Sequence, residues 1–109
     1  MAMIDWSRVR QLRDEVGADE FDEVVEIFLD EVQQGLEHLQ VDDDRSDFEK
    51  HLHSLKGSAL SLGFRTLAKL CQDGERHSAQ GQAATVDIAE IVGTFRTSAT
   101  EFQAGLNEL

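Results

Sequence analysis

The sequence of 109 residues has no proline, a single cysteine and few aromatic side chains, which make up 6% of the residues. β-Strands favour aromatic and β-branched residues bounded by turn residues, so this composition argues against a sheet protein. Leucine, alanine, glutamate and glutamine are plentiful instead, and these residues favour helices. Length and composition together predict one all-α domain that covers residues 1–109.

The lone cysteine, Cys71, excludes an intrachain disulfide framework and indicates a reducing compartment. It falls on an apolar helical stripe, where such a cysteine usually acts as a small core residue. The chain also lacks a run of about 18 apolar residues, and its first residues, MAMIDWSR, lack the apolar stretch of a signal peptide. We therefore expect a cytoplasmic protein.

Positive charge is scarce, because 10 lysine and arginine residues stand against 22 aspartate and glutamate residues, a formal net charge of -12. A surface with this charge repels phosphate backbones and anionic lipids. The sequence thus argues against nucleic acids and membranes as partners and is typical of a well-solvated exterior.

Apolar residues that recur every three to four positions predict five helices. A short first helix covers residues 6–16, with Asp5 as its N-cap and Gly17 as its C-terminal stop. The longer helices are expected at residues 20–39, 46–63, 65–78 and 86–106.

The connections between these helices are short. The acidic run Asp42, Asp43 and Asp44 marks one loop, and a capping box, in which Ser46 and Glu49 each satisfy a backbone N–H, opens the next helix. Short loops between helices of this length imply antiparallel neighbours. The expected fold is an up-down antiparallel four-helix bundle, with the additional short N-terminal helix acting as a lid on one end.

The stretch HSLKGS, residues 53–58, stands out within the helix predicted at 46–63. On a helical projection of ~100° per residue, His53 lies ~140° from Phe48, well away from the apolar stripe. Lys56 and Gly57 flank the same outward region. The stripe itself consists of Phe48, Leu52, Leu55, Ala59 and Leu62.

Leu60 and, if the helix continues, Phe64 project to the same outward side as His53. Apolar residues around a histidine on an otherwise solvated face predict a surface that docks a partner. Gly57 costs a helix roughly 1 kcal/mol relative to alanine. Its missing side chain would let a visiting macromolecule bring a reactive group against the imidazole.

These residues suit phosphoryl transfer. A neutral imidazole is a competent nucleophile, and Lys56 can stabilise an anion on the ring because lysine binds phosphate as a mobile point charge. Transfer of a phosphoryl group requires little more of an acceptor than an aligned nucleophile and nearby positive charge.

The segment HSLKGSALSLG resembles the core motif of histidine-containing phosphotransfer (HPt) domains, in which a histidine is followed three and four residues later by lysine and glycine. Gly63 closes the segment as a further glycine does in that family. The resemblance covers essentially the whole chain. Matching positions elsewhere are Ile4, Asp5, Leu12 and Gly17, then Phe28, and then Leu67, Leu70, Cys71 and Glu75.

The resemblance implies a bundle that accepts a phosphoryl group from an aspartyl phosphate on a receiver domain and passes it to another receiver. It implies that His53 is phosphorylated through Nε2, that Lys56 is the charge partner of the phosphoryl group, and that Gly57 gives the receiver access. The expected partners are response-regulator receiver domains or a hybrid sensor kinase. The chain itself is expected to be a monomer without autonomous kinase activity and without a metal or cofactor, since the Mg²⁺ used in transfer belongs to the receiver.

Two positions depart from the family pattern. Gly74 stands where these domains usually carry a larger apolar residue, which predicts looser packing there. The same helix offers Glu75 and Arg76 in place of an obvious glutamine that would contact the phosphoryl group, so a ligand from this helix stays open.

Three alternatives compete with phosphotransfer. His51 and His53 point ~200° apart on a helix, so they cannot readily share one metal ion, and His38, His51 and His77 are expected to be surface residues. The dimerisation helices of a sensor kinase depend on a nucleotide-binding lobe, which this sequence does not supply. A helical interaction module that binds a signalling partner without transfer stays open, although the complete set of His53, Lys56 and Gly57 argues against it.

Overall fold

The computed structural model describes residues 3–109, and this part of the chain is helical with no strand. The all-α prediction is confirmed; residues 1–2 of the expected domain lie outside the described residues. No helix between residues 3 and 109 has both the length and the hydrophobicity to cross a bilayer. The elements in order are α1 (Trp6–Val16), α2 (Ala18–Val41), α3 (Phe48–Leu62), α4 (Arg65–Ala79), the short 3-10 helix η1 (Ala83–Thr85) and α5 (Ile88–Leu106).

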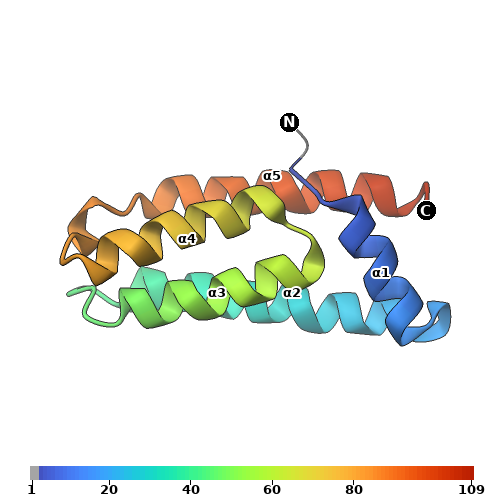
Figure 1. Ribbon diagram of the computed structural model, residues 1–109, viewed down its shortest axis with the longest axis horizontal. Helices are drawn as coiled ribbons and strands as arrows, with labels where there is room; N and C mark the ends of the chain where they lie inside the picture. Colours follow the sequence, from blue (N-terminus) through green and yellow to red (C-terminus); the bar gives the residue numbers. More distant parts are fainter. Residues whose placement is uncertain (1–2) are drawn as a thin grey trace.

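Helices α2, α3, α4 and α5 lie along the long axis of the molecule, and α1 crosses the end where α2 begins and α5 finishes (Figure 1). The ring of Trp6 stacks on Phe102 at a centroid distance of 5.9 Å, which fixes α1 against α5. The backbone N–H of Asp5 donates to the carbonyl of Gly63 at 2.7 Å, which fixes the start of α1 to the α3–α4 turn. The predicted bundle with a short N-terminal helix over one end is confirmed.

The ends of α1 are where the sequence places them. Asp5 is the N-cap, and its side chain accepts the backbone N–H of Arg8 at 3.3 Å. Gly17 ends the helix with a φ of 87°, a conformation that glycine adopts without steric cost. Because Gly17 also serves as the N-cap of α2, that helix begins at Ala18, two residues before the predicted start.

The predicted capping box at Ser46 and Glu49 is wrong. Helix α3 begins at Phe48 with Asp47 as N-cap, and the N–H groups that precede it bond to aspartates of the loop. The N–H of Ser46 donates to Asp44 Oδ1 and the N–H of Asp47 donates to Asp42 Oδ2, each at 3.1 Å. Asp44 and Asp42 of the acidic loop, and not Ser46 and Glu49, therefore accept the backbone N–H groups that precede α3.

Arg45 attaches this loop to the rest of the bundle. Its φ of 57° reverses the chain, and its guanidinium donates to the carbonyls of Ala83 and Val86 at 2.8 and 2.9 Å. The same group lies over the ring of Phe48. Val86 is thereby kept in an extended conformation, and α5 begins only at Ile88, after the N-cap Asp87.

The apolar stripe of α3 faces the core as predicted. Cys71 on α4 is fully buried, and this burial raises the pKa of its thiol to about 12, so it remains a protonated core residue. The stripe consists of Phe48, Leu52, Leu55, Ala59 and Leu62, none of which is more than 1% exposed.

The assignment of Phe64 to the docking face is wrong. Its side chain is 0% exposed, and its ring packs on those of Phe95 and Phe102 at centroid distances of 6.3 and 5.2 Å. The reason lies at Gly63, which ends α3 in a left-handed conformation with a φ of 79°. The helical projection that placed Phe64 beside His53 is not valid beyond Gly63, because the chain leaves the helix there and turns into the core.

The expected looser packing at Gly74 is also wrong. Gly74 is buried in α4, and a Cβ at this position would lie 3.0 Å from Leu52 Cδ1 and 3.4 Å from Val86 Cγ1. These side chains already occupy the space that a larger residue would fill. The glycine permits close packing of α3 on α4.

Replacing Phe64 with alanine should lower the free energy of unfolding by about 3–5 kcal/mol, because it removes a fully buried ring. Leu60→Ala is the matched control, since Leu60 is 54% exposed, and it should change stability by less than about 0.5 kcal/mol. Urea denaturation of both variants measures the difference. Equal effects would contradict the assignment of Phe64 to the core.

Candidate functional site

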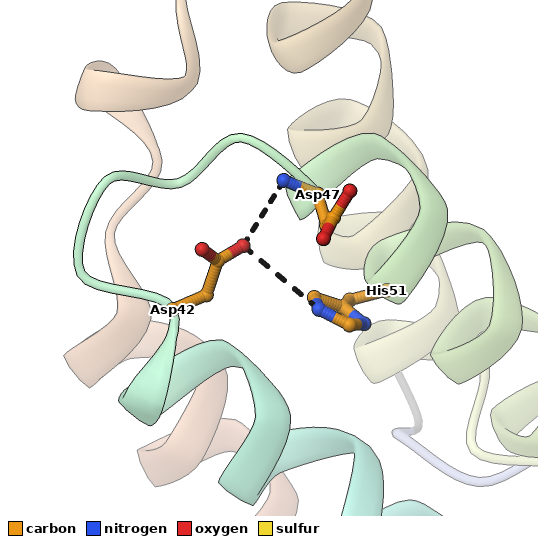
Figure 2. A group of neighbouring side chains, drawn as sticks. All are labelled: Asp42, Asp47 and His51. Atoms are coloured by element: carbon orange, nitrogen blue, oxygen red, sulfur yellow. Dashed lines mark hydrogen bonds and ion pairs between the residues drawn. The ribbon is translucent and has the colours of Figure 1, made fainter.

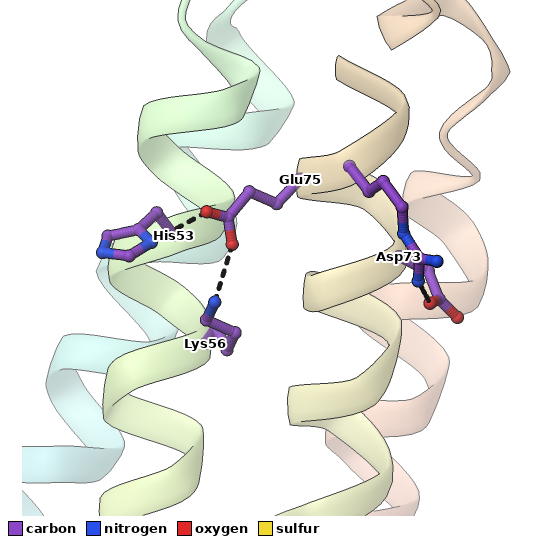
Figure 3. A network of polar contacts seen from close by, with 5 residues as sticks. His53, Lys56, Asp73 and Glu75 are labelled. Carbon is purple, nitrogen blue, oxygen red and sulfur yellow. Dashed lines mark hydrogen bonds and ion pairs between the residues drawn. The ribbon is translucent and has the colours of Figure 1, made fainter. Parts of the chain in front are cut away.

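The candidate site lies on the side of α3 that faces α4. The His53 side chain is 69% exposed, because the apolar stripe of α3 faces the core and leaves the side of the helix that carries His53 in solvent. Lys56 follows one helical turn later, and Glu75 reaches across from α4 (Figure 3). The sequence predicted the placement of His53 and Lys56, but gave no role to Glu75.

Glu75 joins the two α3 residues through its two carboxylate oxygens. Oε2 lies 2.8 Å from His53 Nδ1, and Oε1 accepts a hydrogen bond from Lys56 Nζ at 2.9 Å. Residues three apart on a helix share a face, so a single carboxylate from the neighbouring helix can reach both. The arrangement holds the imidazole and the ammonium group side by side at the edge of the α3–α4 interface.

The Lys56 hydrogen bond lowers the pKa of the Glu75 carboxyl group, and the His53 hydrogen bond lowers it further, while partial desolvation opposes both. Glu75 is therefore ionised at neutral pH. Because its folded-state pKa lies below the ordinary value of 4.5, the carboxylate contributes stability above that pH. This contribution is lost as the pH falls through the folded-state pKa.

An ionised carboxylate only accepts hydrogen bonds, so the contact with Glu75 requires a proton on Nδ1 of His53. In the neutral ring Nε2 then carries the free lone pair. Figure 3 shows the ring extending away from α4, with its second nitrogen on the side opposite Glu75. The geometry presents Nε2 to solvent as the nucleophilic atom.

Gly57 leaves open space beside this ring. It is exposed, and a Cβ built on it would meet no atom of the described residues within 4 Å beyond its chain neighbours and the backbone of its own helix. Gly35 on α2 is different, because a Cβ there would lie 3.1 Å from Leu55 Cδ1. Packing within the chain therefore explains Gly35 but not Gly57.

Leu60 shares the outward face of α3 with His53, from which it is separated by two helical turns. It is 54% exposed. Of the two residues predicted to contact a partner, Leu60 is thus on the surface and Phe64 is in the core. A role for Leu60 in docking stays a prediction.

The residues around Glu75 have separate partners. Arg76 donates to Asp73 on its own helix at 2.6 Å and so is not part of the His53 cluster.

His51 points to the other side of α3, where its Nε2 lies 3.8 Å from Asp42 Oδ2. The prediction that His51 and His53 face different sides of the helix is confirmed.

Replacing Glu75 with alanine should shift the neutral His53 ring from the Nδ1–H tautomer toward the mixture of Nδ1–H and Nε2–H tautomers that a solvated imidazole adopts. The reason is that the acceptor for Nδ1–H is lost. Long-range ¹H–¹⁵N spectra of the two proteins measure this. Asp73→Ala is the control, because Asp73 lies on the same helix without contacting His53. An unchanged tautomer in Glu75→Ala would contradict the role assigned to the carboxylate.

The model of the Hpt domain family matches residues 23–109, which span α3, α4, α5 and most of α2. No curated protein and no solved structure matches the chain. The family match covers most of the chain and includes the whole His53, Lys56 and Glu75 cluster. The chain therefore belongs to the Hpt domain family, the histidine phosphotransfer modules of two-component systems.

Proposed function

We propose that this chain is a phosphorelay intermediate that carries the phosphoryl group on Nε2 of His53. The observation that supports this most directly is the contact between His53 Nδ1 and Glu75, which leaves Nε2 free on an exposed ring. The partners proposed are receiver domains, alone or within a hybrid sensor kinase. Residues 1–109 would act as one monomeric cytoplasmic domain.

In the proposed step the Nε2 lone pair attacks the phosphorus of an aspartyl phosphate on the receiver. An N–P bond forms, the P–O bond to the aspartate breaks, and the aspartate leaves as a carboxylate. The imidazole ring gains positive charge while it keeps its Nδ1 proton. The ionised Glu75 beside that proton stabilises the charged ring. It also keeps the proton on Nδ1, so that the ring leaves as a neutral imidazole when the N–P bond breaks and the group passes to an aspartate of a second receiver.

Lys56 would contribute positive charge to the phosphorylated state. Its ammonium group has three donors, of which one is directed to Glu75. The remaining donors are available to phosphoryl oxygens once the group arrives. Because the Lys56 side chain retains 23% of its exposure, water screens this interaction, and Lys56→Ala should weaken but not abolish transfer.

The chain would neither bind a nucleotide nor require a metal of its own. Transfer between an aspartyl phosphate and His53 conserves the phosphoryl group, so no ATP is consumed at this site. The Mg²⁺ that neutralises phosphoryl oxygens would be held by the receiver's acidic pocket. This chain would supply the aligned nucleophile and the local cation.

His53→Gln should abolish acid-labile phosphorylation by a phosphorylated receiver in Mg²⁺, because glutamine offers no nucleophilic nitrogen. His77→Gln is the matched control, since His77 is also exposed but lies near the end of α4, and it should be labelled like the wild type. Radiolabelled or mass-spectrometric phosphate uptake measures both. Uptake by His53→Gln would refute the assigned residue, and a wild type that binds receivers without uptake would support the interaction-module alternative.

Gly57→Gln should slow transfer by about ten-fold or more, equivalent to ~1.4 kcal/mol, because its side chain enters the space that the receiver needs. The fold should become slightly more stable, since the helix loses a glycine. Gly93→Gln is the matched control, because a Cβ at Gly93 of α5 also meets nothing within 4 Å. Rapid-quench transfer rates and urea denaturation test the pair; equal rates in both variants would contradict the access role.

A further inference from the structure

A second group of polar side chains gathers where α2 passes into α3. His38 and Asp42 are four residues apart at the end of α2, and Asp47 and His51 are four residues apart at the start of α3. Residues with this spacing lie on one face of a helix. The two helices therefore bring an imidazole and a carboxylate each to the same end of the bundle.

The distances within this group are short. Asp42 Oδ2 lies 3.8 Å from His51 Nε2, and one ligand atom from each of Asp42, Asp47 and His51 lies within 4.8 Å of the other two. Figure 2 shows these three side chains converging between the loop and the two helices. The His38 ring lies next to that of His51, with 5.4 Å between the centroids.

Asp42 Oδ2 accepts the backbone N–H of Asp47, but neither this carboxylate nor that of Asp47 pairs with the arginine of the loop. The guanidinium of Arg45 is turned away and donates to the carbonyls of Ala83 and Val86. Asp47 is the N-cap of α3, yet its side chain makes no capping hydrogen bond. Its carboxylate remains beside Asp42 and His51 instead of occupying the position that an N-cap aspartate usually takes.

We propose that Asp42, Asp47 and His51 bind a divalent transition ion of the Zn²⁺ class, with a water as fourth ligand. Ligand atoms ~2.1 Å from a tetrahedral Zn²⁺ are ~3.4 Å apart, so the 3.8 Å between Asp42 and His51 is already close to this value. Asp47 is exposed and can approach by rotation of its side chain. The Asp42 and His51 side chains are held more firmly, at 12% and 25% exposure.

The donor set favours this class of ion over Mg²⁺ and Ca²⁺. Imidazole nitrogen is a common ligand of Zn²⁺, whereas Mg²⁺ and Ca²⁺ are bound almost wholly by oxygen and take about six or more ligands. The site would join the end of α2 to the start of α3. It is separate from the phosphoryl site, because His51 faces Asp42 while His53 faces Glu75.

Titration of the chelator-treated full chain with ZnCl₂, followed by calorimetry and thermal unfolding, tests the site. The wild type should bind one ion and unfold at a higher temperature in its presence, because an ion that binds only the folded state stabilises it. Asp47→Asn and His51→Gln should each weaken binding at least about ten-fold. Asn is as good an N-cap as Asp, so Asp47→Asn should still fold.

His53→Gln and His77→Gln are the matched controls and should bind Zn²⁺ like the wild type. The absence of saturable binding in the micromolar range would overturn the proposal, as would equal affinity in Asp47→Asn and His51→Gln. Loss of binding in His53→Gln would place the ion at the phosphoryl site and also overturn it. Asp47→Asn should take up phosphate normally, so a failure of the metal site is distinguishable from a failure of the proposed relay function.

Discussion

The contact between Glu75 on α4 and two residues of α3 is the interaction on which the chemistry of the site depends. It fixes the His53 tautomer, and it holds Lys56 beside the ring. The contact in turn requires α3 and α4 to approach closely at this level. Leu52 and Gly74, the residues immediately before His53 and Glu75, pack against each other there. A larger side chain at Gly74 would separate the helices and lengthen both hydrogen bonds.

Glycine has two different physical uses within these helices. At Gly35 and Gly74 the missing side chain makes room for Leu55 and Leu52 of the same chain, so its benefit appears in the packing of the bundle. At Gly57 nothing between residues 3 and 109 uses the space. A helix loses roughly 1 kcal/mol of stability at such a glycine without a gain in its own packing. The same is true of Gly93 on α5, but only Gly57 lies one helical turn from His53.

Periodicity in the sequence predicted the helices and the outward direction of His53, because both are properties of one helix at a time. It failed where distant segments meet. Arg45 reaches carbonyls some forty residues away, and the left-handed Gly63 turns the next residue, Phe64, into the core. The role of Glu75 could not be predicted for the same reason. The register of α4 on α3 is set by packing between the two helices, and the spacing of residues within either helix does not determine it.

We propose that His53 carries the phosphoryl group on Nε2 while Nδ1 keeps its proton against Glu75. Long-range ¹H–¹⁵N and ³¹P spectra of the chain phosphorylated by a receiver test it most directly. We expect phosphorus on Nε2 of His53, with Nδ1 still protonated. Phosphorus on Nδ1, or on any other histidine, would contradict it.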